Sequence, residues 1–282
     1  MNIAKYFPLV FIMASALGAC NLEKEVELEL PVYESQLVVE CYLEPGRPFR
    51  LLLSRSAPYF EAFPTDPAEF LTNTLVDDAT VTITHLGETY ELSNGAFIDL
   101  QASKFYNYGT VETVPADYEN EYTLTITTAD GRLATATARI MPKVSIDSVV
   151  VQFNDSDTLA RVLTYFTDDL SRVNFYRRML HFSSLDSIPE QDFTINDELL
   201  DSAKVVFGTT YDFEPGDTVI NTLFHIEKSY YDFMETYQVA ILSNGNPFGQ
   251  PGTIISNIEG DANAIGIFTG FTKDRVTTVV EK

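Results

Sequence analysis

Apolar and polar residues alternate along short stretches in the first half of the chain. In residues 79–84, apolar side chains take every second position and threonines take the others. A period of two is typical of a strand with one buried face. Alternation or a short apolar run predicts strands at these places: 36–43, 48–54, 79–84, Tyr90–Leu92, Tyr122–Ile126 and Ala134–Ala138.

Turn residues separate these predicted strands. Residues 44–47 (EPGR) and the pair Asp130-Gly131 connect neighbouring strands, and Asn94-Gly95 is expected to turn the chain again. Some seven short antiparallel strands in about 110 residues are typical of an immunoglobulin-like or fibronectin-like β-sandwich. We therefore expect such a domain over residues 34–142.

The second half is also rich in strand patterns, and Pro142 interrupts the first series. We place a domain boundary at 142–145 and expect a second β-rich domain over 143–282, beginning with a strand at Ile146. Further strands are expected at these positions: 159–166, 174–182, 203–211, 218–227, 264–272 and 275–281.

One segment of the second half has helical spacing instead. Apolar residues recur every three or four positions at Tyr230, Phe233, Met234, Tyr237 and Ile241. Ser229 and Asp232 have the spacing of a capping box, and Asn244-Gly245 followed by proline is typical of a helix end. The pattern predicts an amphipathic helix over 229–243. Its aromatic stripe either covers a sheet or lines a ligand groove.

The N-terminus has the features of an export leader. Lys5 precedes an apolar run of eleven residues, 7–17, whereas a transmembrane helix needs about 20. Leu17-Gly18-Ala19-Cys20 resembles a bacterial lipobox, which predicts a signal peptide over 1–19 and lipidation of Cys20. Ordinary secretory cleavage after Ala19 is the alternative.

An acidic tether is expected after the lipidated cysteine, over residues 20–33. Four glutamates alternate with other residues, at Glu23, Glu25, Glu27 and Glu29. Acidic residues at this place resemble the signal that exports lipoproteins of Bacteroidota to the outer surface of the outer membrane. We expect an outer-membrane protein, lipid-anchored and exposed on the cell surface, with a periplasm-facing anchor as the alternative.

The charge of the chain limits its partners. The formal net charge is −23 and the pI is near 4.3. Cleavage of the leader removes Lys5 and no acidic residue, which leaves 17 basic side chains against 41 acidic ones. Such a field repels phosphate backbones, so no nucleic-acid partner is expected. Cys41 would then lack a disulfide partner, and its strand context predicts a small buried side chain.

Several short motifs together resemble one protein family. They include 36–43 (QLVVECYL), 51–59 (LLLSRSAPY), 79–83 (ATVTI), 216–219 (GDTV), Tyr231, 246–248 (NPF), 256–260 (SNIEG) and 266–268 (GIF). Their order is similar to that of a Bacteroidota lipoprotein family, domain of unknown function 4249 (DUF4249). The chain departs from the family pattern at Cys41, where glycine is usual, and in the less glycine-rich loop 261–265.

The resemblance implies a role but no reaction. Family members are typically exported lipoproteins, often encoded beside TonB-dependent outer-membrane receptors. A structural or binding role is expected for the motif residues Asn246, Pro247, Phe248, Ser256, Asn257 and Gly260.

The chain contains none of the common catalytic motifs. It lacks a Gly-x-Ser-x-Gly elbow, a His-Glu-x-x-His zinc motif and a Cys-x-x-Cys pair. His85, His181 and His225 are interpreted as structural residues. Residues 154–157 (NDSD) offer oxygen ligands for calcium, but the segment lacks the glycine and the distal glutamate of an EF-hand loop, and Asx turns explain it without an ion. We therefore assign no catalytic residue, no metal ligand and no cofactor.

Together these features favour a non-catalytic surface lipoprotein. We expect an accessory that captures a ligand or docks on a receptor in a TonB-dependent nutrient uptake system. Tyr59, Phe60 and Phe63 are the candidate docking residues for the β-barrel. The alternatives are a surface hydrolase that uses paired carboxylates and a structural adhesion lipoprotein.

Overall fold

The computed structural model describes residues 35–56, 66–99, 104–198, 202–243 and 252–282. Residues Ser35–Lys282 form one compact unit. The chain is mainly β, as the sequence predicts. The lipidation site Cys20 and its tether lie outside the described residues, as do Tyr59, Phe60 and Phe63 and the motif residues Asn246, Pro247 and Phe248.

The first half forms two sheets that share one strand. Its elements are β1 (Leu37–Leu43), β2 (Pro48–Arg55), α2 (Pro67–Thr74), β3 (Thr80–His85), β4 (Glu88–Asp99), β5 (Lys104–Thr113), β6 (Tyr122–Thr127) and β7 (Leu133–Ala138). One sheet has the order β1-β2-β5-β4 and the other β4-β3-β6-β7. The helix α2 was not expected from the sequence.

The shared strand β4 corrects one prediction. Asn94-Gly95 does not end a hairpin, because β4 continues through it with a bulge between Asn94 and Phe97. Residues 88–92 of β4 pair with β3 and residues 93–99 pair with β5, so the bulge lies within the pairing with β5. Bulges bend a strand, which lets one strand contribute to two sheets.

The two sheets enclose one apolar core. Every second residue of β1 and β2 is buried, and the same period appears in β3 and β6. Buried side chains from both sheets, among them Val39, Leu51, Ile83 and Leu124, belong to one cluster. Cys41 lies in this cluster as predicted, and burial raises the pKa of its thiol. This packing is a β-sandwich, which we call the first sandwich.

The second half forms another pair of facing sheets. Its strands are β8 (Ile146–Phe153), β9 (Ala160–Thr167), β10 (Phe175–Phe182), β11 (Gln191–Asn196), β12 (Lys204–Gly208), β13 (Thr218–Ile226) and β15 (Ala264–Val279). The two-residue strand β14 (Glu259–Gly260) instead pairs with β7 of the first sandwich. One sheet has the order β12-β9-β8, and the other contains β11-β10-β13-β15. Buried residues of β9 pack with those of β10 and β13, so we call this pair the second sandwich.

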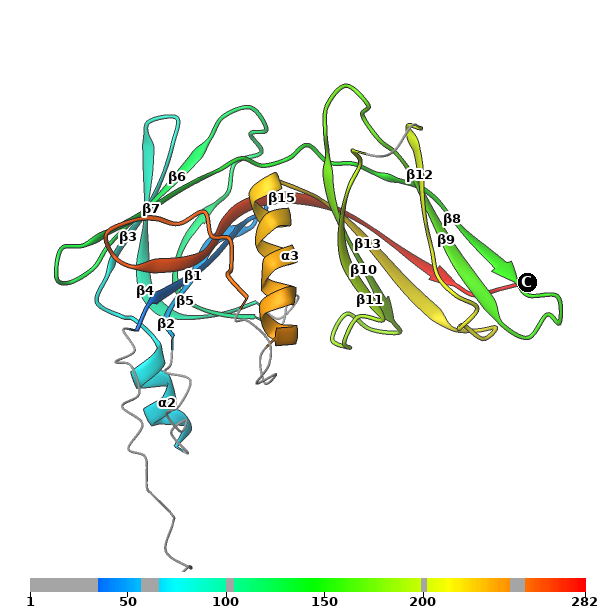
Figure 1. Ribbon diagram of the computed structural model, residues 1–282, viewed down its shortest axis with the longest axis horizontal. Coiled ribbons are helices and arrows are strands. Elements are labelled where there is room, and N and C mark those ends of the chain that lie inside the picture. Colours follow the sequence, from blue (N-terminus) through cyan, green and yellow to red (C-terminus); the bar gives the residue numbers. More distant parts are fainter. Residues whose placement is uncertain (1–34, 57–65, 100–103, 199–201, 244–251) are drawn as a thin grey trace, which may run out of the picture. The chain divides into compact units, whose positions relative to one another are not determined.

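The strand β15 belongs to both sandwiches, as Figure 1 shows. Residues 264–270 pair in parallel with β1, and residues 271–279 pair antiparallel with β13. The break expected between 272 and 275 is therefore wrong, because β15 is continuous for 16 residues. Residues 139–145 connect β7 to β8, and a two-domain division at 142–145 stays a prediction.

The predicted helix is confirmed as α3 (Lys228–Ser243), one residue longer at its start. Tyr230 and Phe233 are buried and pack against Phe224 and Ile267 of the sheet. The helix therefore covers a sheet with the first half of its stripe. Asp232 forms an ion pair with Lys228 at 2.6 Å instead of the expected contact with Ser229. Neither described helix is long and apolar enough to cross a membrane.

Candidate functional site

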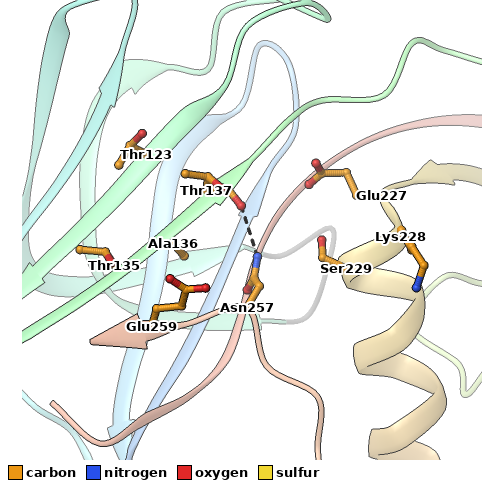
Figure 2. A pocket seen from close by; sticks show the side chains of 9 residues that line it. All are labelled: Thr123, Thr135, Ala136, Thr137, Glu227, Lys228, Ser229, Asn257 and Glu259. Carbon is orange, nitrogen blue, oxygen red and sulfur yellow. Dashed lines mark hydrogen bonds between the residues drawn. The ribbon is translucent and has the colours of Figure 1, made fainter. Parts of the chain in front are cut away.

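A polar groove lies between the outer face of the first sandwich and the start of α3. Its volume is about 620 Å³, and Figure 2 shows its side chains. It is lined by Thr123, Thr135, Ala136, Thr137, Glu227, Lys228, Ser229, Asn257 and Glu259. Most of these residues carry hydroxyl, amide or charged groups, although the exposed surface of the groove is more apolar than polar.

Strand alternation supplies the threonine wall of the groove. Thr123 of β6 lies opposite Thr137 of β7 in the antiparallel register. Their neighbours Leu124 and Ala138 point into the apolar core. Because successive side chains of a strand point to opposite faces, the buried positions force the threonines outward. This wall therefore rests on the packed core of the first sandwich.

Glu227 forms the opposite wall, between the last residue of β13 and the first of α3. Its Oε1 accepts a hydrogen bond from Arg139 N at 2.8 Å, and its Oε2 accepts one from Thr269 Oγ1 at 3.4 Å. Burial raises the pKa of the Glu227 carboxyl to about 7, although these hydrogen bonds oppose the shift. The group therefore exchanges its proton near neutral pH while it ties β13 to the chain after β7 and to β15.

Asn257 joins the groove to the sheet. Its Nδ2 donates to Phe268 O at 2.7 Å and to Thr137 O at 3.3 Å, and its Oδ1 accepts from Phe268 N at 3.0 Å. The dashed line in Figure 2 marks the contact with Thr137. The Asn257 amide thus makes the two hydrogen bonds with the backbone of Phe268 that a neighbouring strand would make. These bonds hold Asn257 in place in the lining of the groove.

Two other motif residues lock the same segment. Ser256 Oγ accepts hydrogen bonds from Gly266 N and Ile258 N, both at 3.1 Å. Gly260 has φ +123°, and a Cβ there would lie 2.2 Å from Leu133 O, so only glycine fits. Of the three described motif residues, Asn257 alone lines the groove. Whether the motif has a structural or a binding role stays a prediction.

The second sandwich contains a buried pair of carboxyl groups. Asn174 N donates to Oδ1 and Oδ2 of Asp197, both at 2.9 Å. Asn174 Nδ2 donates to Asp197 Oδ2 at 2.9 Å and to Asp168 Oδ1 at 3.1 Å, and Asp168 also accepts from the Tyr176 hydroxyl. Burial and the neighbouring Asp197 raise the pKa of Asp168.

This carboxyl pair bears on the hydrolase alternative. A nearby pocket of about 150 Å³ is lined by Asn174 and His225, but neither Asp168 nor Asp197 lines it. Both carboxyl groups instead hold the loop before β10 against the end of β11. In the described structure, Asp168 and Asp197 accept hydrogen bonds inside the protein.

The predicted structural histidines all lie in strands. His85 is buried, contacts Glu121 O at 3.1 Å and Asp117 Oδ2 at 3.2 Å, and stacks on the Tyr122 ring. Burial lowers the pKa of His181 and of His225, whose Nδ1 lies 2.7 Å from Pro142 O.

The loop considered for calcium is closed by its own asparagine. Asn154 Oδ1 accepts from Thr158 N at 3.0 Å and from Ser156 Oγ at 3.1 Å. This is the Asx turn that the sequence offered as the alternative to an ion site.

Sequence reasoning missed the role of Glu227 and of the Asp168 and Asp197 pair. No sequence motif singled out Glu227. Its local signal is its position between a strand buried at nearly every residue and a helix. A carboxyl group between a buried strand and a helix is partly buried as well. Nothing local indicated that Asp168 and Asp197, 29 positions apart, would share one asparagine.

These observations define a β-sandwich protein with a polar groove at the junction of its two halves. The chain matches the family described as Domain of unknown function (DUF4249) over residues 23–277, and it belongs to that family. A comparison with curated proteins found no match.

Solved structures were also compared. The chain is similar to one titled "Cytokine receptor complex - Crystal form 1A", with 8% identity and a TM-score of 0.28. The similarity covers 68% of this chain and 86% of the other. A TM-score of this size carries no argument about function.

Proposed function

We propose that this protein is a non-catalytic lipoprotein of the outer membrane that captures a polar ligand in the groove beside α3. It serves as an accessory component of a TonB-dependent uptake system and is displayed on the cell surface. The lipobox at Cys20 and the acidic tether support the location. The groove is the observation that supports ligand capture.

The dimensions and chemistry of the groove suit a small polar molecule. Small-molecule sites usually have volumes of about 300–1,000 Å³, and the groove has about 620 Å³. Glu227 and Glu259 give it two carboxyl groups, while the nearby Lys228 is already paired with Asp232. A neutral ligand with hydroxyl groups, or a cationic ligand, fits this lining better than an anion.

A blocked groove tests ligand capture. Thr135→Trp places an indole among the lining side chains, and Thr89→Trp is the matched control at an exposed place on the same sheet. Calorimetric titration with purified oligosaccharides, amines and short peptides should find a ligand that binds the wild type and the control. The blocked variant should bind at least tenfold more weakly. Equal binding by all three proteins would remove the groove from the proposal.

A second experiment tests the receptor partnership. An affinity-tagged copy extracted in mild detergent should recover a TonB-dependent β-barrel in near-equal amount. Replacing Phe60 and Phe63 with serine should release the barrel if these aromatics form the docking surface. Recovery of no barrel with the wild type would contradict the partnership. A barrel retained by the folded double variant would exclude only these two residues.

The anchor has its own test. Cys20→Ser prevents acylation and should move the protein from the membrane fraction to a soluble or unprocessed form. Unchanged partitioning of the variant would contradict the lipoprotein assignment.

The hydrolase alternative has one supporting observation, the pairing of Asp168 and Asp197. Both groups are buried and hold Asn174, which supports a structural use. A hydrolytic activity lost in Asp168→Asn with an unchanged melting temperature would favour the hydrolase.

A further inference from the structure

An arginine lies in the middle of the second sandwich, between its two sheets. Arg178 of β10 is 1% exposed and is the largest of the fully buried side chains. Thr164 of β9 and Asn221 of β13 lie beside it and are equally buried. We call these three residues the Arg178 layer. It separates two apolar clusters, one around Val162 and the other around Phe166.

The hydrogen bonds of the guanidinium group all go to neutral oxygens. Nη1 donates to Gln191 Oε1 at 2.7 Å, and Nη2 donates to Asn221 Oδ1 at 2.9 Å and weakly to Thr164 Oγ1 at 3.4 Å. No carboxylate of the described residues forms an ion pair with Arg178. Burial lowers the pKa of Arg178 to about 10, so the group keeps its charge at neutral pH.

Two donors of the layer have no partner among the described residues. They are Arg178 Nε and Asn221 Nδ2, and both atoms are inaccessible to solvent. The amide oxygen of the layer is already used, because Asn221 Oδ1 also accepts from Thr164 Oγ1 at 2.7 Å. Asn221 Oδ1 thus accepts two hydrogen bonds, and the layer has two unpaired donors with a single lone pair left on Thr164 Oγ1.

This imbalance favours an anion over a water molecule. A buried water makes about three hydrogen bonds, and it must donate its own hydrogens to acceptors. An anion accepts from several donors and also supplies the missing negative charge. An uncompensated buried charge costs several kcal/mol, and neutral oxygens offset only part of it.

We propose that the Arg178 layer binds a small monovalent anion of halide size, with chloride as the physiological candidate. Arg178 Nε and Asn221 Nδ2 donate to the ion. Its size is limited because apolar side chains close the layer on both sides, among them Leu180 and Phe207. This site is separate from the groove beside α3 and does not depend on the proposed function.

Unfolding in two salts of equal ionic strength tests the site. Chloride should stabilise the protein, whereas gluconate is too large to enter. Binding to the folded state alone lowers the unfolding equilibrium constant about tenfold for each tenfold rise in chloride well above the dissociation constant. Bromide should act like chloride. Equal stability in chloride and gluconate would overturn the proposal.

Two variants locate the effect. Arg178→Met removes the charge and should abolish the difference between chloride and gluconate. Arg161→Met, on the outer face of β9 beside Gln152, is the matched control and should keep it. Retention of the chloride effect in Arg178→Met would show that the ion binds elsewhere.

A third variant decides the matter if Arg178→Met does not fold. Asn221→Asp provides a carboxylate beside the guanidinium group, so it should fold and lose its response to chloride. The chloride-35 resonance should broaden with the wild type and stay sharp with Asn221→Asp. A folded Asn221→Asp variant that responds to chloride like the wild type would refute the site.

Discussion

The two sandwiches of this protein differ in the composition of their cores. The core of the first is one apolar cluster, whereas that of the second is divided by the Arg178 layer. Each contains a buried asparagine. Asn107 of the first sandwich bonds to Leu53 N, Leu53 O and Val76 O with every group of its amide. Asn221 of the second leaves its Nδ2 without a partner among the described residues.

The difference separates residues that support a fold from residues available for binding. Buried polar groups in native proteins are almost always hydrogen-bonded, so each exception needs a physical reason. Two such exceptions in the second sandwich, Arg178 Nε and Asn221 Nδ2, belong to neighbouring residues, and one of them is part of a charged group. In the first sandwich Asn107 only joins β5 to β2 and to the chain before β3. The second sandwich is therefore the place to look for a bound ion.

The largest expected effect comes from a cavity in the first sandwich. Leu124→Ala removes a fully buried side chain from the continuous apolar cluster. It should lower the free energy of unfolding by about 3–4 kcal/mol, because a close-packed core relaxes only partly around a void. Urea unfolding followed by circular dichroism measures this loss. A loss below about 1 kcal/mol would show that this core is loosely packed.

A smaller effect is expected in the Arg178 layer. Thr164→Val keeps the shape but removes the hydroxyl that donates to Asn221 Oδ1 at 2.7 Å. The cost should be about 1–2 kcal/mol, the usual penalty for breaking a buried hydrogen bond. Thr125→Val, on the outer face of the first sandwich, is the matched control and should stay within about 0.5 kcal/mol of the wild type. An unchanged free energy of unfolding in Thr164→Val would mean that the hydrogen bond between Thr164 and Asn221 contributes nothing to stability.

The junction between the sandwiches should respond to pH through Glu227. Its pKa rises from an ordinary 4.5 to about 7 on folding, so the folded state binds more protons between these values. Stability should therefore fall as pH rises from 4.5 to about 7, and change no further from this group above that range. Glu227→Gln cannot ionise, and its melting temperature should lack this component of the fall. Identical pH profiles for the two proteins would contradict the assignment.

The thiol of Cys41 reports on opening of the first sandwich. In a protein that carries Cys20→Ser, Cys41 is the remaining cysteine, and it is fully buried. A thiol reagent should label it only through opening of the sandwich, and so orders of magnitude more slowly than in denaturant. Leu124→Ala should speed labelling in the native state. Fast labelling of the wild type would contradict the buried position.

The same probe tests whether the sandwiches open together. If they unfold as separate units, Thr164→Val in the second sandwich should leave labelling of Cys41 unchanged. An equal acceleration by Thr164→Val and Leu124→Ala, scaled to their stability losses, would show one cooperative unit. This outcome would contradict the predicted division at 142–145.

The sequence by itself determined many of the strands and the place of α3, but not α2, β5 or β11. Period-two patterns around Val81 and Leu124 and the helical spacing from Tyr230 are local, because each element orients its own side chains toward one buried face. The same rule explains the burial of Cys41. The turn expected at Asn94-Gly95 failed because a pair that suits a hairpin also suits a bulge, and only the neighbouring strands select between them.

Tertiary structure alone decided which distant residues meet. Nothing near β15 in sequence indicates that it pairs with β1 and then with β13. The groove, the two acids around Asn174 and the Arg178 layer each combine residues from several strands or loops. Hydrogen bonding and desolvation depend on the distance between groups and on their access to water. These quantities are set by the packing of whole sheets, and local patterns do not contain them.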